Sequence, residues 1–485
     1  MSEAIPPDRA PSSATATTTR WLACDHAWLG DRMAHDTWLG IGADGTITEL
    51  VQEPPERPDA PVQRVAGVTL PGLVDTHGHA FHRHLRGRAQ PDGVGDGSPR
   101  GARDDFWRWR ERMYAVARTL DPDGMFAIAR AVYGEMALAG ITCVGEFHYV
   151  HHQPDGTPYA DPNAMGRAVV AAADEVGIRL TLLDTLYLTG RVGATLDDPD
   201  LDDVQRRFSD GDAHRWATRV ADLSETATTR LGAAIHSVRA VPPEAIADVA
   251  ALAVGTDAGS VRVLHAHVAE QVAEGEATRA VHGRSPTRLL ADAGALSERF
   301  TAVHGVWLDD DDRALLGDAG ATVCACPTTE QDLADGIVDG AALADAGVRL
   351  ALGSDQHVVV DLFAEARGLE LGQRLATRTR GHHDPAALLA AATTGGAHSL
   401  GWPELGRLEV GAPADLAVVA TGSVRLVGIP DDDLASALVF AATAADVTAT
   451  MVAGQWIVRD GAHVRRDVGD DLRRALDVDL AGGHR

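Results

Sequence analysis

The chain has 485 residues, more than one hydrophobic core usually supports, so we expect a large domain with a smaller companion. Its 45% hydrophobic and 23% charged residues are typical of a globular protein, and no apolar run approaches the roughly 20 residues that cross a membrane. The formal net charge of -27 opposes binding to phosphate backbones and anionic lipids. We therefore expect neither nucleic acid nor a membrane as a partner.

All 43 basic residues are arginines, because the sequence contains no lysine. Schiff-base chemistry, the P-loop lysine and a carbamylated-lysine bridge between two metal ions all need that amine. Any metal site is therefore expected to hold a single ion. The cysteines are too few and too scattered for the disulfide framework of a secreted protein, which favours a reducing, cytoplasmic location: Cys24, Cys143, Cys324 and Cys326.

The N-terminal region begins with a stretch rich in Ala, Ser, Thr and Pro. Residues 1–19 lack the basic start and apolar centre of a signal peptide, and we expect them to form a disordered tail. Asp44-Gly45 then separates two short β-prone runs, Trp38–Ile41 and Thr46–Leu50. This pattern predicts a β-hairpin with a two-residue turn.

Short apolar strands return near the C-terminus. They are expected at Leu416–Ala420 and Thr450–Val458, after a segment rich in glycine. We therefore predict that both ends of the chain build one small β-sandwich domain, from residues 20–70 and 401–470, and that 471–485 form a C-terminal tail.

Between these ends, residues 71–400 alternate brief apolar runs with Ala-rich amphipathic stretches such as Pro122–Ala139 and Ala164–Val176. This alternation is typical of repeated βα units, and it predicts an α/β fold, a (β/α)8 TIM-like barrel, with a doubly wound open sheet as the alternative. In a barrel the carboxyl ends of all strands lie on one face, so distant residues converge there. The eight candidate strands end near His77, Glu146, Asp184, His236, His267, His304, Cys324 and Asp355.

Three of these strand-end positions, together with His79, carry side chains of the kinds that bind zinc. His77 and His79 follow one apolar strand, and the two-residue period of a strand points both imidazoles to the same side. His267 adds a third imidazole and Asp355 a carboxylate. Three histidines and one aspartate suit a single Zn2+ ion with a position left for water, Fe2+ being the alternative.

Two further residues have the chemistry of proton transfer beside such an ion. Glu270, three residues after His267, can turn back toward the site and shuttle a proton, while His304 can stabilise a transition state or transfer a proton. Bound zinc lowers the pKa of water to about 7. We therefore assign catalytic roles to Glu270, His304 and the ligand Asp355, and expect hydrolytic deamination of a small molecule.

The motifs Pro71–His79, His267 with Glu270, His304, and Ser354-Asp355 occur in an order that resembles the amidohydrolase superfamily. Within it, the chain is similar to the formimidoylglutamate deiminase family over residues 71–400. The resemblance implies zinc-dependent hydrolysis of a C–N bond in a linear amidine, from N-formimidoyl-L-glutamate to N-formyl-L-glutamate and ammonia in histidine degradation. It rests on the runs Phe106–Arg110, Glu146–His152, His236–Arg239, Cys326–Glu330, Gly353–Asp355 and Gly368–Gln373.

This resemblance also suggests which residues bind the substrate. Arg110 and Arg239 would bind the two carboxylates of a glutamate moiety, since guanidinium groups pair with carboxylates. Tyr149 would add a hydroxyl donor, and His236 a contact to the formimidoyl end. His82 stands where the family has a glutamine expected to touch the substrate, and an imidazole does not reproduce both the donor and the acceptor of an amide.

Three alternatives follow from the same residues. Another deaminase of the superfamily would act on a related amidine or guanidino acid, or on a heterocycle. Against a heterocycle, the chain is only 5% aromatic and shows no obvious stacking cluster at the strand ends. A non-catalytic barrel serving as a scaffold would need damaged metal ligands.

The enzyme is expected to be a homodimer.

Overall fold

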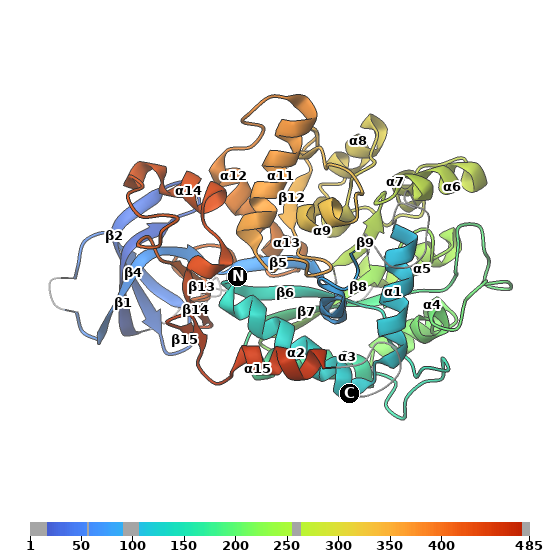
Figure 1. Ribbon diagram of the computed structural model, residues 1–485, viewed down its shortest axis with the longest axis horizontal. Helices are drawn as coiled ribbons and strands as arrows, with labels where there is room; N and C mark the ends of the chain where they lie inside the picture. Colours follow the sequence, from blue (N-terminus) through green and yellow to red (C-terminus); the bar gives the residue numbers. More distant parts are fainter. Residues whose placement is uncertain (1–16, 56–57, 91–105, 255–262, 478–485) are drawn as a thin grey trace, which may run out of the picture.

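The computed structural model describes residues 17–55, 58–90, 106–254 and 263–477. A parallel barrel surrounded by helices lies beside a separate sheet (Figure 1). This confirms the expected fold class. The barrel strands follow one another in chain order and are all parallel: β5 (Leu73–Gly78), β6 (Ile141–His148), β7 (Arg179–Leu186), β8 (Thr229–Ile235), β9 (Leu264–Val268), β10 (Phe300–His304), β11 (Thr322–Ala325) and β12 (Arg349–Leu352).

The barrel closes between its first and last strands. A parallel bridge joins Gly78 to Asp355, the backbone N–H of His79 donates to the carbonyl of Asp355 at 3.1 Å, and that of Asp355 donates to the carbonyl of His77 at 2.9 Å. A doubly wound sheet would be open and would reverse its strand order, so that alternative is wrong. The closure itself brings His77, His79 and Asp355 together.

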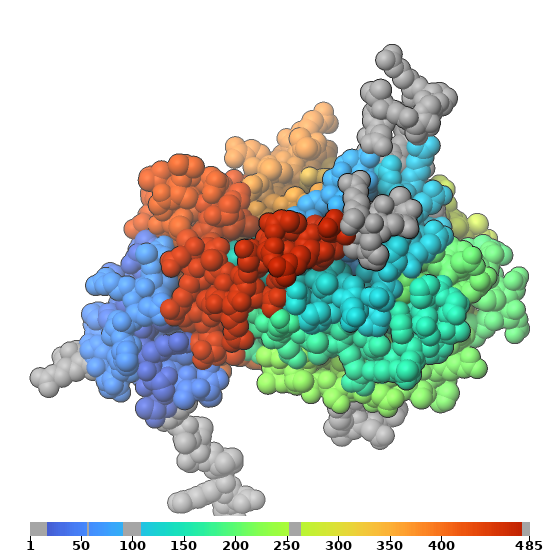
Figure 2. Space-filling model, turned by 60° about the horizontal axis from the view of Figure 1, so that its bottom comes forward, coloured from blue at the N-terminus to red at the C-terminus, as the bar shows by residue number. Residues whose placement is uncertain are grey.

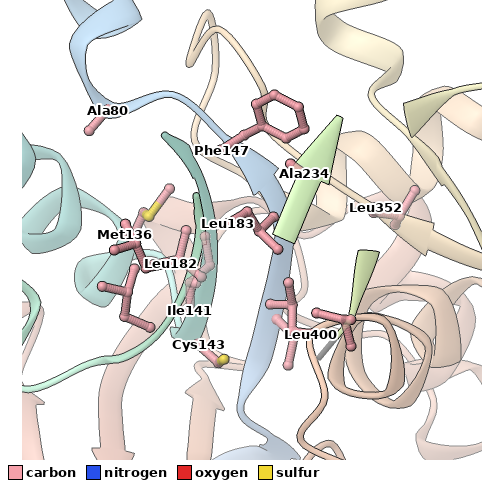
Figure 3. Packing of buried hydrophobic residues seen from close by; sticks show 14 of the residues in the cluster. Ala80, Met136, Ile141, Cys143, Phe147, Leu182, Leu183, Ala234, Leu352 and Leu400 are labelled. Atoms are coloured by element: carbon pink, nitrogen blue, oxygen red, sulfur yellow. The ribbon is translucent and has the colours of Figure 1, made fainter. Parts of the chain in front are cut away.

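The strands of the barrel are buried on both faces, as expected for a parallel sheet covered by helices. Every residue of β6 and β7 is buried. Figure 3 shows part of this core, including Leu400, whose carbonyl accepts a hydrogen bond from Thr181 at 2.8 Å. Ser399, the last residue of α13 (Gly396–Ser399), hydrogen-bonds with His265 and Thr301. The C-terminal end of α13 therefore fills the end of the barrel opposite the strand ends that carry the reactive residues.

Helices pack around the barrel, two of them where the sequence predicts them. Asp121 caps α2 by accepting from the N–H of Gly124, with Pro122 in the first turn, a favourable helix start. α3 ends at Gly177 in a left-handed conformation. These two helices span Pro122–Leu138 (α2) and Ala164–Val176 (α3). The other larger helices are α1 (Phe106–Thr119), α4 (Ala213–Val220), α5 (Pro243–Val254), α6 (Val272–His282), α7 (Pro286–Asp292), α8 (Asp310–Asp318), α11 (Leu362–Thr377) and α14 (Leu434–Phe440). Shorter helices are α9 (Pro327–Asp332), α10 (Gly340–Asp345) and α12 (Pro385–Ala390).

The second sheet contains strands from both ends of the chain, in the order β16-β15-β14-β13-β4-β1-β2-β3. It encloses its own hydrophobic cluster, which includes Leu22, Ile47 and Leu416. β4 continues through Gly72 into β5, so this sheet leads directly into the barrel. The bounds are β1 (Thr18–Trp28), β2 (Met33–Gly42), β3 (Ile47–Val51), β4 (Val62–Pro71), β13 (Leu416–Val419), β14 (Val447–Val452), β15 (Gln455–Arg459) and β16 (Ala462–His463).

Of the predicted β segments of this domain, Leu416–Ala420 is observed as β13, and the other two regions differ in outcome. β2 and β3 pair antiparallel around Asp44-Gly45, as the hairpin signal predicts. Thr450–Val458, expected as one strand, is instead the hairpin of β14 and β15. Its turn residues, Ala453 and Gly454, have φ values of 46° and 72°, and this left-handed backbone reverses the chain where an uninterrupted strand was expected.

The expected tails also differ from the structure. Residues 1–16 of the tail expected at 1–19 lie outside the described residues, whereas Thr18 already belongs to β1. At the other end, the segment expected as a tail from 471 begins inside α15 (Val468–Leu476), while 478–485 lie outside the described residues. α15 packs against α2 because Leu472 and Ala475 contribute to the core, and in Figure 2 the red C-terminal segment lies between the blue sheet and the cyan part of the barrel.

Among the helices described, none combines the length and the apolar character needed to cross a membrane.

Candidate active site

Four potential metal ligands meet at the carboxyl ends of the barrel strands. Ligand nitrogens of His77, His79 and His267 lie within 4.8 Å of one another. Oδ1 of Asp355 lies 3.4 Å from Nε2 of His77 and 3.4 Å from Nε2 of His79. Atoms bound about 2.0–2.2 Å from one tetrahedral zinc ion are roughly 3.3–3.6 Å apart. The observed spacing therefore fits one divalent ion.

Hydrogen bonds orient the imidazoles for metal binding. Nδ1 of His79 lies 2.8 Å from the carbonyl of Phe147, and Nδ1 of His267 lies 2.8 Å from the carbonyl of His236. A carbonyl only accepts, so Nδ1 carries the proton and Nε2 keeps its lone pair. His77 is fully buried, and neither ring nitrogen has a hydrogen-bond partner in the described chain. Such unpartnered buried nitrogens are what a metal ion would satisfy.

The protonation states of these ligands suit a cation. Burial lowers the pKa of His79 to about 3 and also lowers the pKa of His77, so both imidazoles are neutral. Burial would raise the pKa of Asp355, but its close approach to the neighbouring imidazoles, first of all His77 at 3.4 Å, outweighs it, and the net pKa is lowered. Two neutral imidazoles and a carboxylate can share one ion without losing protons.

Strained backbone lies beside this centre. His304 has a φ of 73° and Asp355 a φ of 45°, left-handed values that cost a residue with a Cβ about 1–3 kcal/mol. Both residues end or follow barrel strands, and the surrounding sheet holds them in these conformations. The strain therefore coincides with the converging side chains.

Buried carboxylates support the segments that carry the ligands. Glu146 accepts from the N–H of Ala80 at 2.9 Å and from the hydroxyl of Tyr133 at 2.9 Å, which anchors the turn η1 (Ala80–Leu85) after His79. Asp75 accepts from the N–H of Ser354 at 3.0 Å. The sequence indicated Glu146 as a strand end and as part of the run Glu146–His152, but not this supporting role, since its partners lie on other segments.

His304 lies between carboxylates. Its Nε2 is 3.7 Å from Oε1 of Glu270 and 4.0 Å from Oδ2 of Asp355, and its Nδ1 is 3.5 Å from Oε1 of Glu330. Burial alone would lower the pKa of His304, but the charge of Glu270 and the other carboxylates raise it to about 10. The ring is therefore cationic and can donate a proton from either nitrogen.

The candidate catalytic and substrate residues face a common cavity of about 380 Å³. Its wall contains two of the predicted metal-ligating imidazoles, the Asp355 carboxylate, both proton-transfer candidates and every predicted substrate residue. These are His79, His267, Asp355, Glu270 and His304, together with His82, Arg110, Tyr149, His236 and Arg239. The sequence-derived set thus meets around one space, with His77 immediately behind it.

A model of a known protein family matches most of the chain. This model, described as the amidohydrolase family, matches residues 68–457. The chain belongs to this family. It is 38% identical over 454 residues to formimidoylglutamate deiminase from Pseudomonas aeruginosa, covering 91% of this chain and 95% of that protein. It is 31% identical over 417 residues to 5-methylthioadenosine/S-adenosylhomocysteine deaminase from Natronomonas pharaonis, covering 84% and 85%.

A solved structure agrees with this assignment. The crystal structure of an amidohydrolase from Brucella melitensis matches with a TM-score of 0.82 and 32% identity, covering 94% of this chain and 99% of that one. Family and relatives together identify an enzyme that hydrolyses C–N bonds, a deaminase of the amidohydrolase family. The scaffold alternative needed damaged ligands, whereas here the donor set is complete.

The cavity of this amidohydrolase has an aromatic wall that the sequence did not reveal. Ring centres of Phe208 lie 5.0 Å from Tyr149, 5.4 Å from Tyr187 and 6.0 Å from Tyr114. The inference that no stacking cluster exists is therefore wrong. These rings come from α1, the end of β6 and the loop after β7, so no local pattern indicates that they meet.

The predicted substrate residues already have partners in the amidohydrolase. Nε2 of His82 lies 3.0 Å from the hydroxyl of Tyr149, while its Nδ1 is buried without a partner in the described chain. The guanidinium of Arg110 lies 5.3 Å from the ring centre of Tyr114. Arg239 donates to Glu274 at 3.1 Å, a residue the sequence analysis did not single out because its significance comes only from this pairing.

Proposed function

We propose that this amidohydrolase converts N-formimidoyl-L-glutamate and water to N-formyl-L-glutamate and ammonia, a step of histidine degradation, with one zinc ion held by His77, His79, His267 and Asp355. One observation supports this most: the metal-ligating residues share a cavity with two guanidinium groups, Arg110 and Arg239. Guanidinium groups match the two carboxylates of a glutamate moiety. The 38% identical relative is itself named for this reaction.

A bound zinc ion would supply a Lewis acid and lower the pKa of water. Glu270 would accept a proton from the attacking water and pass it to the imino nitrogen. As the new C–O bond forms, the C–N bond to that nitrogen breaks, and both protons of the water leave with ammonia. The cationic His304, 3.7 Å from Glu270, would stabilise negative charge on the attacking oxygen.

His82 would contribute to the binding of the amidine, although the family has glutamine there. Its Nε2 hydrogen-bonds the hydroxyl of Tyr149 at 3.0 Å, and its Nδ1 has no partner in the described chain. One ring nitrogen would therefore fix Tyr149 while the other faces a substrate nitrogen. A glutamine would supply the same two functions through its oxygen and its amide nitrogen.

A second candidate is deamination of a heterocycle. The aromatic wall of Tyr114, Tyr149, Tyr187 and Phe208 favours it, since flat rings stack on aromatic side chains. A relative that is 31% identical is named for deamination of adenosine derivatives. A neutral heterocycle would leave the charges of Arg110 and Arg239 without a substrate partner, which favours the acidic amidine.

The test is ammonia release from zinc-loaded protein offered five compounds in parallel: formimidoylglutamate, formimidoylaspartate, guanidinoglutarate, 5-methylthioadenosine and cytosine. We expect the highest kcat/KM with formimidoylglutamate. A higher kcat/KM with either heterocycle would overturn the proposal in favour of the second candidate. Protein reconstituted with Fe2+ in place of Zn2+ serves to identify the more active metal.

We further propose that the enzyme acts in the cytoplasm. All four cysteines are buried and unpaired, in agreement with a reducing compartment. The homodimer expected from the resemblance stays a prediction, which sedimentation of the purified protein can check.

A further inference from the structure

Gln205 connects two tyrosines on the wall of the cavity. It is buried at the start of η2 (Gln205–Phe208), in the loop that follows β7. Its Nε2 lies 2.9 Å from the hydroxyl of Tyr187 and 3.2 Å from the hydroxyl of Tyr114. Its Oε1 accepts from the N–H of Asp202 at 2.9 Å. This backbone contact fixes the orientation of the amide, so Nε2 donates to both tyrosines.

The direction of these hydrogen bonds determines what the tyrosines can offer. Each hydroxyl oxygen accepts from Gln205, and each hydroxyl proton must therefore point elsewhere. The hydroxyl protons remain for a ligand in the cavity that both tyrosines line. The arrangement presents an O–H donor to the cavity.

Positive charge accompanies this donor. The guanidinium of Arg110 lies 5.3 Å from the ring centre of Tyr114, and the charges of Arg110 and Arg239 both act on Tyr187. A hydroxyl donor beside guanidinium groups has the chemistry that binds a carboxylate. A neutral ring would use the aromatic faces but not this charge.

The cluster lies at a distance from the metal-ligating residues. The ring centres of His267 and His236 are 5.2 Å apart, and those of His236 and Tyr187 are 4.7 Å apart. Phe208 packs against Tyr187 on the same wall. A substrate whose amidine lies at His267 would therefore reach Tyr187 with its other end.

We propose that Tyr114 and Tyr187, oriented by Gln205, bind the substrate carboxylate that lies farthest from the amidine and so select for a dicarboxylate of this length. Tyr114 and Tyr187 would touch the substrate, and Gln205 is a positioning residue. The inference rests on the proposed function, because it assumes an acidic amidine in the cavity.

The test compares two ligands that differ only at the remote carboxylate: N-formyl-L-glutamate and its side-chain amide, N-formyl-L-glutamine. Their binding to zinc-loaded protein is measured by calorimetry. For Tyr187→Phe and Tyr114→Phe we expect affinity for the acid to fall roughly ten- to a hundredfold, the size of one charged hydrogen bond, with little change for the amide. Tyr159→Phe is the matched control, because Tyr159 is not among the residues lining the cavity.

Gln205→Glu tests the positioning role. A carboxylate there would accept both hydroxyl protons and turn them away from the ligand. We expect the preference for acid over amide to disappear and the KM for formimidoylglutamate to rise more than kcat falls. Gln205→Asn, a shorter amide, should retain part of the preference if its nitrogen still reaches one hydroxyl.

Equal effects of the tyrosine variants on acid and amide would overturn the inference, as would wild-type protein that binds both ligands equally. Failure of the proposed function has a different signature. In that case the wild type would release no ammonia from formimidoylglutamate, whatever its preference between the two ligands.

Discussion

Glu274 holds Arg239 on the wall of the cavity: its Oε2 accepts from Nη1 of the guanidinium at 3.1 Å. The side chain of Glu274 is completely buried and that of Arg239 is 17% exposed. Nη2 of Arg239 also lies 3.6 Å from Oε2 of Glu270, the proposed proton shuttle. One guanidinium thus joins a structural carboxylate to a catalytic one.

Because of this pairing, loss of Arg239 should affect both the stability of the fold and the binding of the substrate, and the two effects can be measured separately. Arg239→Met leaves Glu274 buried without its partner, so we expect a loss of about 3–5 kcal/mol in unfolding free energy and a rise in KM for formimidoylglutamate. Adding Glu274→Leu should restore most of the stability but not the KM. Denaturant unfolding and steady-state kinetics measure the two effects, with exposed Glu276→Gln on the same helix as control. Recovery of KM in the double variant would remove Arg239 from substrate binding.

We expect the protein to lose its metal ion when any one of the four proposed ligands is removed. For His267→Ala and Asp355→Asn we expect neither bound zinc after dialysis nor ammonia release. Asp355→Asn leaves the backbone bridge to Gly78 intact, so the barrel should still close. Elemental analysis gives the zinc content, and His214→Ala, on the exposed face of α4, is the control. Either variant with one zinc per chain and full activity would contradict the assignment.

Glu270 is expected to matter for turnover and not for metal binding. Glu270→Gln keeps the shape of the side chain but cannot accept the proton of the attacking water. We expect kcat to fall at least roughly 10²-fold, the typical contribution of a general acid or base, with zinc content unchanged. A kcat equal to that of the wild type would assign the proton transfer to another group.

The sequence predicted the barrel and much of the site for one physical reason. Polar residues such as His267 and Asp355 lie at or just after the ends of short apolar runs, and the carboxyl ends of barrel strands share one face. No pattern in the sequence predicted the contacts between segments that lie far apart in the chain. Gln205 meets Tyr114 across 91 positions of sequence, and α15 reaches α2 from the far end of the chain. Such pairings depend on tertiary packing, which periodicity does not encode.

The proposed contact of His82 with the substrate can be tested by substitution. Because His82 is linked to Tyr149 through Nε2 at 3.0 Å, a glutamine there could keep the same hydrogen bond. We expect His82→Gln to retain kcat/KM for formimidoylglutamate within roughly threefold, and His82→Leu to lose at least roughly tenfold, the size of one hydrogen bond. Steady-state kinetics of ammonia release from formimidoylglutamate provide the measurement. Equal activity of the two variants would show that His82 makes no polar contact to the substrate.

A second buried ion-pair network lies outside the cavity and links β7 to α4. Arg219 donates to both oxygens of Asp184 at 2.8 and 2.9 Å, and to Asp210 at 2.8 and 2.9 Å. Its side chain is 5% exposed, and those of Asp184 and Asp210 are 1% and 6% exposed. Burial would raise the pKa of both carboxyls. For Asp184 the charge of Arg219 outweighs this effect, and for Asp210 the hydrogen bonds of His152 and then Arg219 do so. Both pKa values therefore lie below the ordinary 3.8.

Carboxyls with a lowered folded-state pKa stabilise the fold above their unfolded value near 3.8, and this stability is lost as the pH falls through that value and below. Arg219→Leu leaves two buried carboxylates without their guanidinium partner, while Trp216 still donates to Asp184 and His152 still lies beside Asp210. We expect this loss to cost about 3–5 kcal/mol at pH 7. The difference from wild type should narrow at pH 4, because the carboxyls of the variant can then be protonated and neutral. Urea unfolding at both pH values measures it, and Arg215→Leu, whose side chain is 73% exposed on the same helix, should match the wild type throughout. An equal difference in unfolding free energy between variant and wild type at both pH values would show that the loss of stability does not come from these carboxylates.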